Sequence, residues 1–265
     1  EETNMISNRK AVALEGRLKH CRNVVTLGVK SNFCDYSQAQ IDMIRRAEKI
    51  YYPSSFYADL FDAAGKRTFP SYHTYKCVQD KIKQTALFQL LGILHPQTRT
   101  FYGPRQKASI PRHFDYPFIA KVPRGSAMGR GVYLIRDAAD LQAYLDTVHP
   151  AYIQRYLPID RDIRVVVIGP RVVHAYWRIA PATDFRSNVA VGARVSCDPV
   201  PEEARHLALH TARSCGWDDV GIDICVHDGR CYVLEANMKY GKEGFRAAGI
   251  DYPRLMETMI ENGEI

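Results

Sequence analysis

The alternation of apolar and polar positions is clearest over residues 220–237, where it predicts a β-hairpin. Asp228 and Gly229 supply its turn. A two-residue loop would turn polar side chains onto the face that the aliphatic residues of the first strand must bury, which is costly. A three-residue loop with a left-handed Gly229 instead pairs Ile224 with Tyr232 and leaves one face apolar. We therefore expect the three-residue loop.

The other face of this hairpin carries three oxygen ligands, Asp223, Glu235 and Asn237. They lie near one level on neighbouring strands, and carboxylate and amide oxygens are the ligands that Mg²⁺ takes from a protein. The competing interpretation is a solvated hairpin face on which two acids meet by chance, which is the commoner outcome for an arbitrary hairpin. The rest of the chain has to decide between the two.

The first part of the chain predicts a small α/β layer. Residues 24–29 form an apolar run typical of a strand, and Ser37 with Gln40 forms a capping box that opens a helix. The segment 51–75 is rich in aromatic residues and is broken by prolines. We expect this segment to wrap the layer up to a boundary near residue 77.

Two lysines lie at the ends of predicted elements. A helix is predicted between Asp80 as its N-cap and Gly92 as its C-terminal stop, with Lys81 in its first turn. Residues 116–122 predict a strand, with Lys121 near its end. Taken alone, a lysine at a helix start is usually a solvated surface charge.

A glycine-rich loop at 123–131 leads straight into a predicted strand at 132–135. Its glycines let the backbone fold over a ligand, so that its N–H groups could face phosphate oxygens. A dinucleotide fingerprint or a P-loop needs a helix directly after the glycines, so this loop is neither of these. A flexible hairpin tip is the competing interpretation. A helix from Asp137 to Val148 then completes a unit of the size of a lid.

The next segment predicts further strands. Residues 152–157 and 162–168 have strand patterns, and a turn leads into another strand that ends at Arg178. The polar loop 184–188 carries a second arginine, Arg186, although a loop of this size is usually solvated. A helix with acids at its positive end then leads to the hairpin, and a final helix follows it.

Composition narrows the class of protein. With 265 residues, 46% of them hydrophobic, the chain can hold one large domain or two to three small ones. It shows no membrane-length apolar run and no apolar signal segment, so we predict a cytoplasmic protein, and its weakly patterned first 22 residues suggest an arm or an added helix. Seven cysteines without a CxxC pair indicate neither a disulfide framework nor a zinc site. A net charge of +7, dispersed along the chain, favours nucleotides or acidic metabolites over nucleic acid as partners.

Taken in order, these pieces resemble the ATP-grasp superfamily, and within it the RimK-type glutamate ligases and related carboxylate-amine ligases. The resemblance runs from about residue 79 to residue 249 and rests on seven motifs in the family's order, each of them weak by itself. The motifs are QDK at 79–81, GILHPQT at 92–98, AKVPRGSAMGRGV at 120–132, YIQRYLPIDRDIR at 152–164, WRIAPATDFRSN at 177–188, GIDI at 221–224 and EANMKYGKEGF at 235–245.

The resemblance implies an α/β (α+β) class and an ATP-grasp fold. A small N-terminal α/β pre-ATP-grasp domain would cover residues 1–78. The ATP-grasp domain would cover residues 79–265 and would include a mobile lid subdomain at about 115–150.

The resemblance also implies how ATP would be held. Lys81 and Lys121 would contact its phosphates and the edge of the adenine. The glycine-rich loop would close over the triphosphate, the segment 154–157 would line the adenine through its backbone, and Asp162 would lie at the ribose. The full set of residues implied beside the two lysines is Gly125, Ser126, Gly129, Gly131, Gln154, Arg155, Tyr156, Leu157, Asp162, Arg186, Ser187 and Asn188.

Catalytic and metal roles are implied in the same way. The catalytic residues would be Arg178, Arg186 and Asn188, facing the transferred phosphoryl group and an acyl phosphate. The three oxygen ligands of the hairpin would bind two Mg²⁺ ions, with Mn²⁺ as a substitute, and Glu235 would bridge them.

The implied activity is that of an ATP- and Mg²⁺-dependent carboxylate-amine ligase, which forms a peptide-like amide bond through an acyl phosphate. It would add glutamate or another amino acid to a carboxylate of a small molecule, a peptide or a protein tail; a homo-oligomer stays open. Arg155, Tyr240 and Leu94 depart from the family's usual acid and prolines, so the substrates stay open too. The alternatives are a non-catalytic nucleotide-binding regulatory module with this fold, and a nucleic-acid-binding protein.

Overall fold

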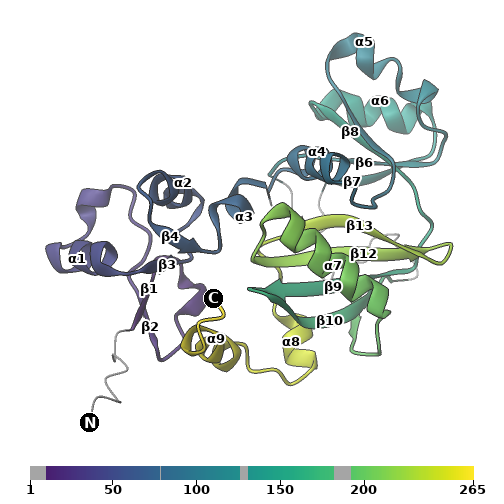
Figure 1. Cartoon of the computed structure of the whole chain (residues 1–265). Coiled ribbons are helices and arrows are strands. Elements are labelled where there is room, and N and C mark those ends of the chain that lie inside the picture. Colours follow the sequence, from purple (N-terminus) through teal and green to yellow (C-terminus); the bar gives the residue numbers. More distant parts are fainter. Residues whose placement is uncertain (1–9, 78, 126–130, 182–191) are drawn as a thin grey trace.

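The chain builds three β-sheets in the part that the computed structural model describes, residues 10–77, 79–125, 131–181 and 192–265 (Figure 1). Figure 1 shows one sheet at the N-terminal side, one beside α4 and α6, and a larger one under α7. Across these ranges, no helix is long and apolar enough to cross a membrane. The mixed α/β class is confirmed.

The first sheet is parallel, with strand order β2-β1-β3-β4. Its elements are β1 (Ala11–Ala13), η1 (Gly16–Leu18), β2 (Val24–Thr26), η2 (Phe33–Asp35), α1 (Gln38–Arg46), β3 (Lys49–Tyr51), α2 (Ser55–Ala63), β4 (Arg67–Phe69) and α3 (Tyr72–Cys77). The capping box of α1 is confirmed, because the Ser37 side chain accepts from the backbone N–H of Gln40 and the Gln40 side chain accepts in return.

Two expectations for this region are wrong. The first 22 residues were expected to be an arm or an added helix, but they contain β1, an inner strand of the sheet. The segment 51–75 was expected to wrap the layer, but it supplies the edge strand β4 and the helix α2. Strands of three residues are too short to show an alternation pattern, which explains why β1 and β4 were missed.

The second sheet is antiparallel, with order β5-β8-β6-β7. Its elements are α4 (Lys81–Leu91), β5 (Thr98–Phe101), α5 (Gly103–Lys107), η3 (Ile110–Arg112), β6 (Phe118–Lys121), β7 (Val132–Ile135), α6 (Ala138–Thr147) and β8 (Ala151–Arg155). Asp80 and Asp137 cap α4 and α6 as predicted, since each side chain accepts from two backbone N–H groups of the first turn. Leu141 and Tyr144 of α6 pack into the same core as Phe118.

The third sheet is antiparallel, with order β11-β10-β9-β12-β13. Its elements are β9 (Arg161–Ile168), β10 (Arg171–Ile179), β11 (Arg194–Ser196), α7 (Glu202–Cys215), β12 (Asp219–His227), β13 (Arg230–Asn237), α8 (Glu243–Ala247) and α9 (Tyr252–Glu261). Ala204, Ala208 and Ala212 of α7 share a core with Val165 and Ile222. Small residues on the helix let it lie close to the sheet.

The register predicted for the β12–β13 hairpin is wrong. The loop has two residues, with His227 opposite Arg230, and both Asp228 and Gly229 have positive φ, at 48° and 71°. Ile224 therefore faces Val233 rather than Tyr232. A β-bulge then inserts one extra residue, Leu234, so that the strands beyond it change phase. The bulge brings the polar residues onto one face, which the sequence argument had assigned to a longer loop.

The end of the chain returns to the first sheet. Met256 and Met259 of α9 and Ile265 lie in one buried core with Ala13 and Phe69. Figure 1 shows α9 and the C-terminus beside the first sheet. Long-range packing of this kind joins the N-terminal layer to the rest of the chain, and the division at residues 78 and 79 stays a proposal.

Candidate functional site

The three polar side chains of the hairpin meet at the open end of β12 and β13. Asp223 lies opposite Glu235, and Gly221 lies opposite Asn237. The Asn237 Nδ2 donates to Glu235 Oε1 at 2.9 Å and lies 3.5 Å from Asp223 Oδ2. The structure therefore brings together the three residues that the sequence singled out.

This trio contains only two acids. Among the residues that the structure describes, no cluster of three or more His, Cys, Asp or Glu side chains could hold a metal ion by itself. The third ligand here is an amide, and carboxylate and amide oxygens form a donor set that Mg²⁺ accepts when water completes its shell. The donor chemistry fits a magnesium site.

Two lysines from other elements face Glu235. Lys81, at the start of α4, places its Nζ 3.7 Å from Glu235 Oε2, and these side chains are only 13% and 20% exposed. Burial acts to raise the pKa of the Glu235 carboxyl, but Lys81, Lys121 and Asn237 outweigh it and lower that pKa to about 2. Burial also lowers the pKa of the Lys121 ammonium, and Glu235 partly offsets this. The cluster concentrates positive charge beside an ionised acid.

Asp223 belongs to a buried network with two arginines. Arg178 makes a two-point contact with Asp162, at 2.7 and 2.6 Å, and its Nη2 also lies 2.9 Å from Asp223 Oδ2. Arg164 donates from Nη2 to the same oxygen at 3.1 Å and from Nε to Oδ1. All four side chains are buried. Two-point contacts between guanidinium and carboxylate fix orientation as well as charge.

Two of these network residues had other roles in the sequence prediction. Asp162 was expected at the ribose, and Arg178 at the transferred phosphoryl group; here they bind each other. Both roles stay predictions. Arg164 was missed, although a signal existed: it follows Asp162 by two positions on β9, so both side chains lie on one face of that strand.

A second missed residue is Gln84. Its Nε2 donates to the carbonyl oxygen of Ala236 at 2.9 Å, and its Oε1 accepts from the N–H of Ala236 at 3.0 Å. Because β13 ends the sheet, the Gln84 side chain takes the place of a further strand at this residue. Ala236 lies between Glu235 and Asn237, so Gln84 holds the backbone that carries both.

The predicted adenine segment runs along β8 and just beyond it. Gln154 is 4% exposed and donates from Nε2 to Thr98 Oγ1 at 3.0 Å. The Arg155 side chain is exposed, while its backbone N–H donates to the carbonyl of Gln97 at 2.8 Å. Tyr156 and Leu157 follow the strand, and Leu157 is buried.

The ends of the glycine-rich loop are tied to neighbouring elements. Gly125 and Gly131 both have positive φ, at 68° and 71°. The Lys81 N–H donates to the carbonyl of Pro123 at 3.0 Å, and Val122 N–H donates to Gly131 at 2.7 Å. Five predicted site residues lie outside the described ranges, namely Ser126, Gly129, Arg186, Ser187 and Asn188.

The solved structures similar to this chain have ATP-grasp folds. A RimK domain protein of Sphaerobacter thermophilus superposes with a TM-score of 0.70 at 15% identity, covering 94% of this chain and 98% of that one. The D-alanine–D-alanine ligase of Bacillus anthracis gives a TM-score of 0.67 at 16% identity, over 90% and 85% of the two chains. At such identities the likeness establishes the fold, and the predicted ATP-grasp fold is confirmed.

Curated relatives match at higher identity. A probable alpha-L-glutamate ligase of Parasynechococcus marenigrum is 31% identical over 209 residues, or 76% of this chain. The ribosomal protein bS6–L-glutamate ligase of Escherichia fergusonii is 32% identical over 191 residues, or 69% of this chain. The matches span 45% and 63% of those relatives. The family model described as the RimK-like ATP-grasp domain matches residues 78–260, so this chain belongs to the RimK-like ATP-grasp family.

Proposed function

We propose that the protein is an ATP- and Mg²⁺-dependent carboxylate-amine ligase. The observation that carries the proposal is the meeting of Lys81 and Lys121, from α4 and β6, with the acids of the hairpin. A metal-bound triphosphate needs cations at its oxygens and oxygen ligands for its metal. This arrangement offers both at one place, within a chain of the matching family.

In the proposed reaction, a carboxylate oxygen attacks the γ-phosphorus of ATP, ADP leaves and an acyl phosphate forms. The amine nitrogen then attacks the acyl carbon, phosphate leaves, the nitrogen loses a proton and an amide remains. Because both partners of the first step are anions, the protein has to neutralise them. Lys121 suits this task, since a buried charge acts more strongly than one in water.

The hairpin residues Asp223, Glu235 and Asn237 would hold Mg²⁺. The metal would neutralise the phosphate oxygens during the transfer. Glu235 would contact it most readily, because its side chain keeps 20% exposure whereas that of Asp223 keeps 3%. Asp223 is already bonded by two guanidinium groups, so Arg164 and Arg178 would fix its orientation. A second ion and replacement by Mn²⁺ belong to the same proposal.

The remaining assignments extend this proposal. Arg178, Arg186 and Asn188 would face the transferred phosphoryl group. The unit at about 115–150 would act as the lid, with residues 1–78 as the pre-ATP-grasp domain, in the cytoplasm. Glutamate is the first amine to test, because the matched relatives are named as glutamate ligases. The acceptor carboxylate would come from a small molecule, a peptide or a protein tail.

The test measures ADP and phosphate release with Mg²⁺ across a panel of carboxylic acids, each with glutamate and with other amines. Glu235→Gln is the matched control, because glutamine keeps the size of the side chain and removes only its charge. Release that needs both an acid and an amine, and that falls by about a hundredfold or more in the control, would support the ligase.

Other outcomes decide between the alternatives. ATP binding without release for any pair of substrates would favour the non-catalytic regulatory module. Release that needs neither an acid nor an amine, or that survives in Glu235→Gln, would contradict the proposed mechanism. Binding to nucleic acid with a steep dependence on salt concentration would favour the third interpretation.

A further inference from the structure

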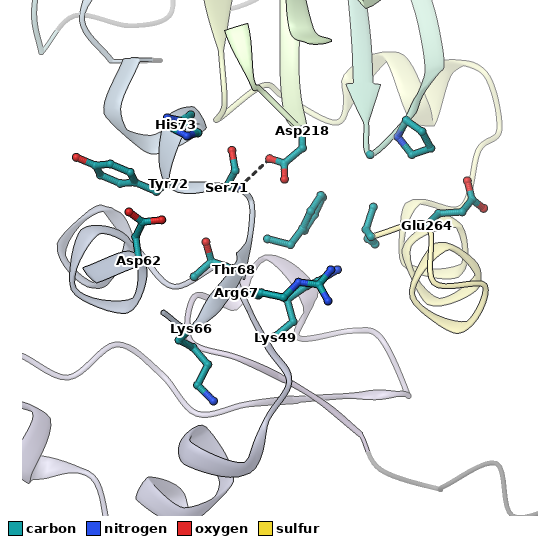
Figure 2. A pocket seen from close by; sticks show the side chains of 14 residues that line it. Lys49, Asp62, Lys66, Arg67, Thr68, Ser71, Tyr72, His73, Asp218 and Glu264 are labelled. Atoms are coloured by element: carbon teal, nitrogen blue, oxygen red, sulfur yellow. Dashed lines mark hydrogen bonds between the residues drawn. The ribbon is translucent and has the colours of Figure 1, made fainter. Parts of the chain in front are cut away.

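A cavity lies far from the acids of the hairpin, against the edge strand β4 (Figure 2). We call it the β4 cavity; it has a volume of about 440 Å³. Its walls come from β3 and β4, the start of α3, the β9–β10 turn and the last two residues. Asp218, just before β12, reaches into it, and Asp223 lies five residues further along that chain. At about 3.3 Å per residue, five residues of extended strand place Asp218 roughly 16 Å from Asp223.

Two cations face each other across neighbouring strands at this cavity. Lys49 of β3 and Arg67 of β4 are direct partners in the parallel register, and both line the cavity. Like charges placed side by side on a sheet destabilise it. Burial lowers the pKa of the Lys49 ammonium, and Arg67 lowers it further. Figure 2 shows the two side chains close together, so a bound anion would relieve their repulsion.

Neither cation has a strong carboxylate partner within the described residues. No ion pair within 4.0 Å joins Lys49 to an acid there. Arg67 pairs with Glu48 at 2.8 Å, but these side chains are 64% and 84% exposed. Exposed pairs of this kind contribute little, about 0–1 kcal/mol. Both cations are therefore available to a ligand in the cavity.

The acids that line the cavity are engaged elsewhere or lie at its rim. Glu264 accepts from Arg171 at 2.7 Å. Asp218 accepts from the backbone N–H of Ser71 at 2.8 Å and from the Thr74 hydroxyl at 3.0 Å. The remaining acid, Asp62, is exposed. Asp218 and Glu48 raise the pKa of the Lys49 ammonium, but they do not offset burial and Arg67, which lower it.

The rest of the wall suits an organic molecule. Phe69 and Ile265 give it buried apolar surface, and Thr68 and Tyr72 bring hydroxyl groups. Lys66 would not contact the anion, because its Nζ donates to the carbonyls of Arg45 and Ala47 at 2.8 and 2.6 Å. An apolar wall with a few charged groups, in a volume of this order, is typical of sites for small molecules.

We propose that the β4 cavity binds a small organic anion, a carboxylate or a phosphate compound, whose charge lies between Lys49 and Arg67. This site is separate from the proposed nucleotide site and does not depend on the ligase assignment. The apolar wall would contact the carbon skeleton of the ligand, and the hydroxyl groups would select its orientation.

The test is calorimetric titration of the whole chain with citrate and, separately, with inorganic pyrophosphate. A non-hydrolysable ATP analogue with Mg²⁺ is kept in excess, so that the nucleotide site cannot take up the probe. Because citrate and pyrophosphate both chelate Mg²⁺, the heat of the same titration without protein is subtracted. Binding should weaken about tenfold or more in Lys49→Met and in Arg67→Met, because each variant removes one charged contact. Lys19→Met and Arg105→Met are the matched controls, since both residues are exposed and neither lines the cavity.

The two probes separate the sources of the anion. Tighter binding of citrate would identify a carboxylate ligand, and tighter binding of pyrophosphate a phosphate ligand. Thermal unfolding of the variants guards against misfolding: with the repulsion removed, Lys49→Met should unfold no earlier than the unchanged protein. The proposal is overturned if neither probe binds at millimolar concentration, or if Lys49→Met and Arg67→Met bind as tightly as the controls.

Discussion

Two aspartates on the same strand, four residues apart, have opposite surroundings. Asp223 contacts the guanidinium groups of Arg164 and Arg178. Asp219 accepts from the hydroxyls of Tyr52 and Tyr240 at 2.7 and 2.5 Å. Both residues are buried, at 2% and 0% exposure. Burial alone therefore does not distinguish the acid proposed for the metal site from an acid that only joins parts of the fold, and the kind of partner has to be considered.

The cluster around Asp219 connects distant parts of the chain, and we call it the joint; it comprises Arg17, Tyr52, Asp219, Tyr240 and Tyr252. Arg17 follows β1, and its guanidinium lies 4.4 Å from the ring centroid of Tyr240 and 5.3 Å from that of Tyr252 in α9. Its Nε lies 3.9 Å from Asp219 Oδ2. The first sheet, the third sheet and the last helix thus meet on one carboxylate. The Asp223 cluster, by contrast, lies beside Glu235 and Lys81, which keep part of their surface exposed to a ligand.

Asp219→Ala is the variant with the largest expected effect on stability, and it tests the difference between the Asp219 and Asp223 clusters most directly. It leaves two buried hydroxyls and a nearly buried arginine without their acid, and removing one partner of a buried charge pair costs about 3–5 kcal/mol. Urea denaturation should show a fall of this order in the free energy of unfolding. Asp219→Asn, which keeps one acceptor oxygen, is the control and should lose less. A fall below about 1 kcal/mol for the alanine variant would mean that this cluster is no joint.

Glu235→Gln should have the opposite effects, with a large loss of activity and a smaller loss of stability. We expect kcat/KM for ATP to fall about a hundredfold or more, equivalent to about 2.7 kcal/mol of transition-state stabilisation, because the carboxylate proposed for Mg²⁺ is lost. The free energy of unfolding should fall less than in Asp219→Ala, since Asn237 keeps its acceptor. The measurement is ADP release beside urea denaturation. Equal losses of stability in the two variants would remove the distinction between site and joint.

The local features of both regions could be predicted from sequence. The cap residues Ser37, Asp80 and Asp137 accept hydrogen bonds from backbone N–H groups of the first helical turn. Such contacts join residues close in sequence, so the sequence alone predicts them. The polar residues of the hairpin are also visible in the sequence, but the register that brings Asp223 opposite Glu235 is not. The predicted three-residue loop was wrong, because the alternation of apolar and polar residues does not reveal the bulge at Leu234.

The contacts between segments could not be predicted. Arg164 lies in a buried strand, and nothing near it in the sequence shows that Asp223, 59 positions later, will face it. Arg17 meets Tyr252 across 235 positions. A pattern of apolar positions states which side of an element is buried but not which partner covers it. The joint at Asp219 could therefore not be predicted from the sequence, whereas the resemblance to a known family pointed to the candidate site at the hairpin.

A third acid, Asp218, gives a test through pH. Burial raises the pKa of its carboxyl to about 6 from 3.8, although Ser71 and Thr74 donate to it. Between these values the folded protein holds a proton that the unfolded chain has lost, so the contribution of Asp218 to stability falls as the pH rises through about 6. Asp218→Asn should therefore gain about 2 kcal/mol relative to the unchanged protein between pH 4 and pH 7. Urea denaturation across that range measures the difference, and two parallel curves would contradict it.

The smallest expected loss of stability comes from a variant that removes the hydroxyl of Tyr252 but keeps its ring. Tyr252→Phe removes the acceptor of the Arg17 Nε bond, which is 3.1 Å long, but keeps the ring that Arg17 and Lys242 cover. We expect a loss of about 1 kcal/mol, the usual worth of one hydrogen bond. Tyr252→Leu, which also removes the ring, is the matched comparison and should lose more in urea denaturation. If the phenylalanine variant lost as much as Asp219→Ala, the stability of the joint would rest on its hydroxyl bonds rather than on the buried carboxylate charge.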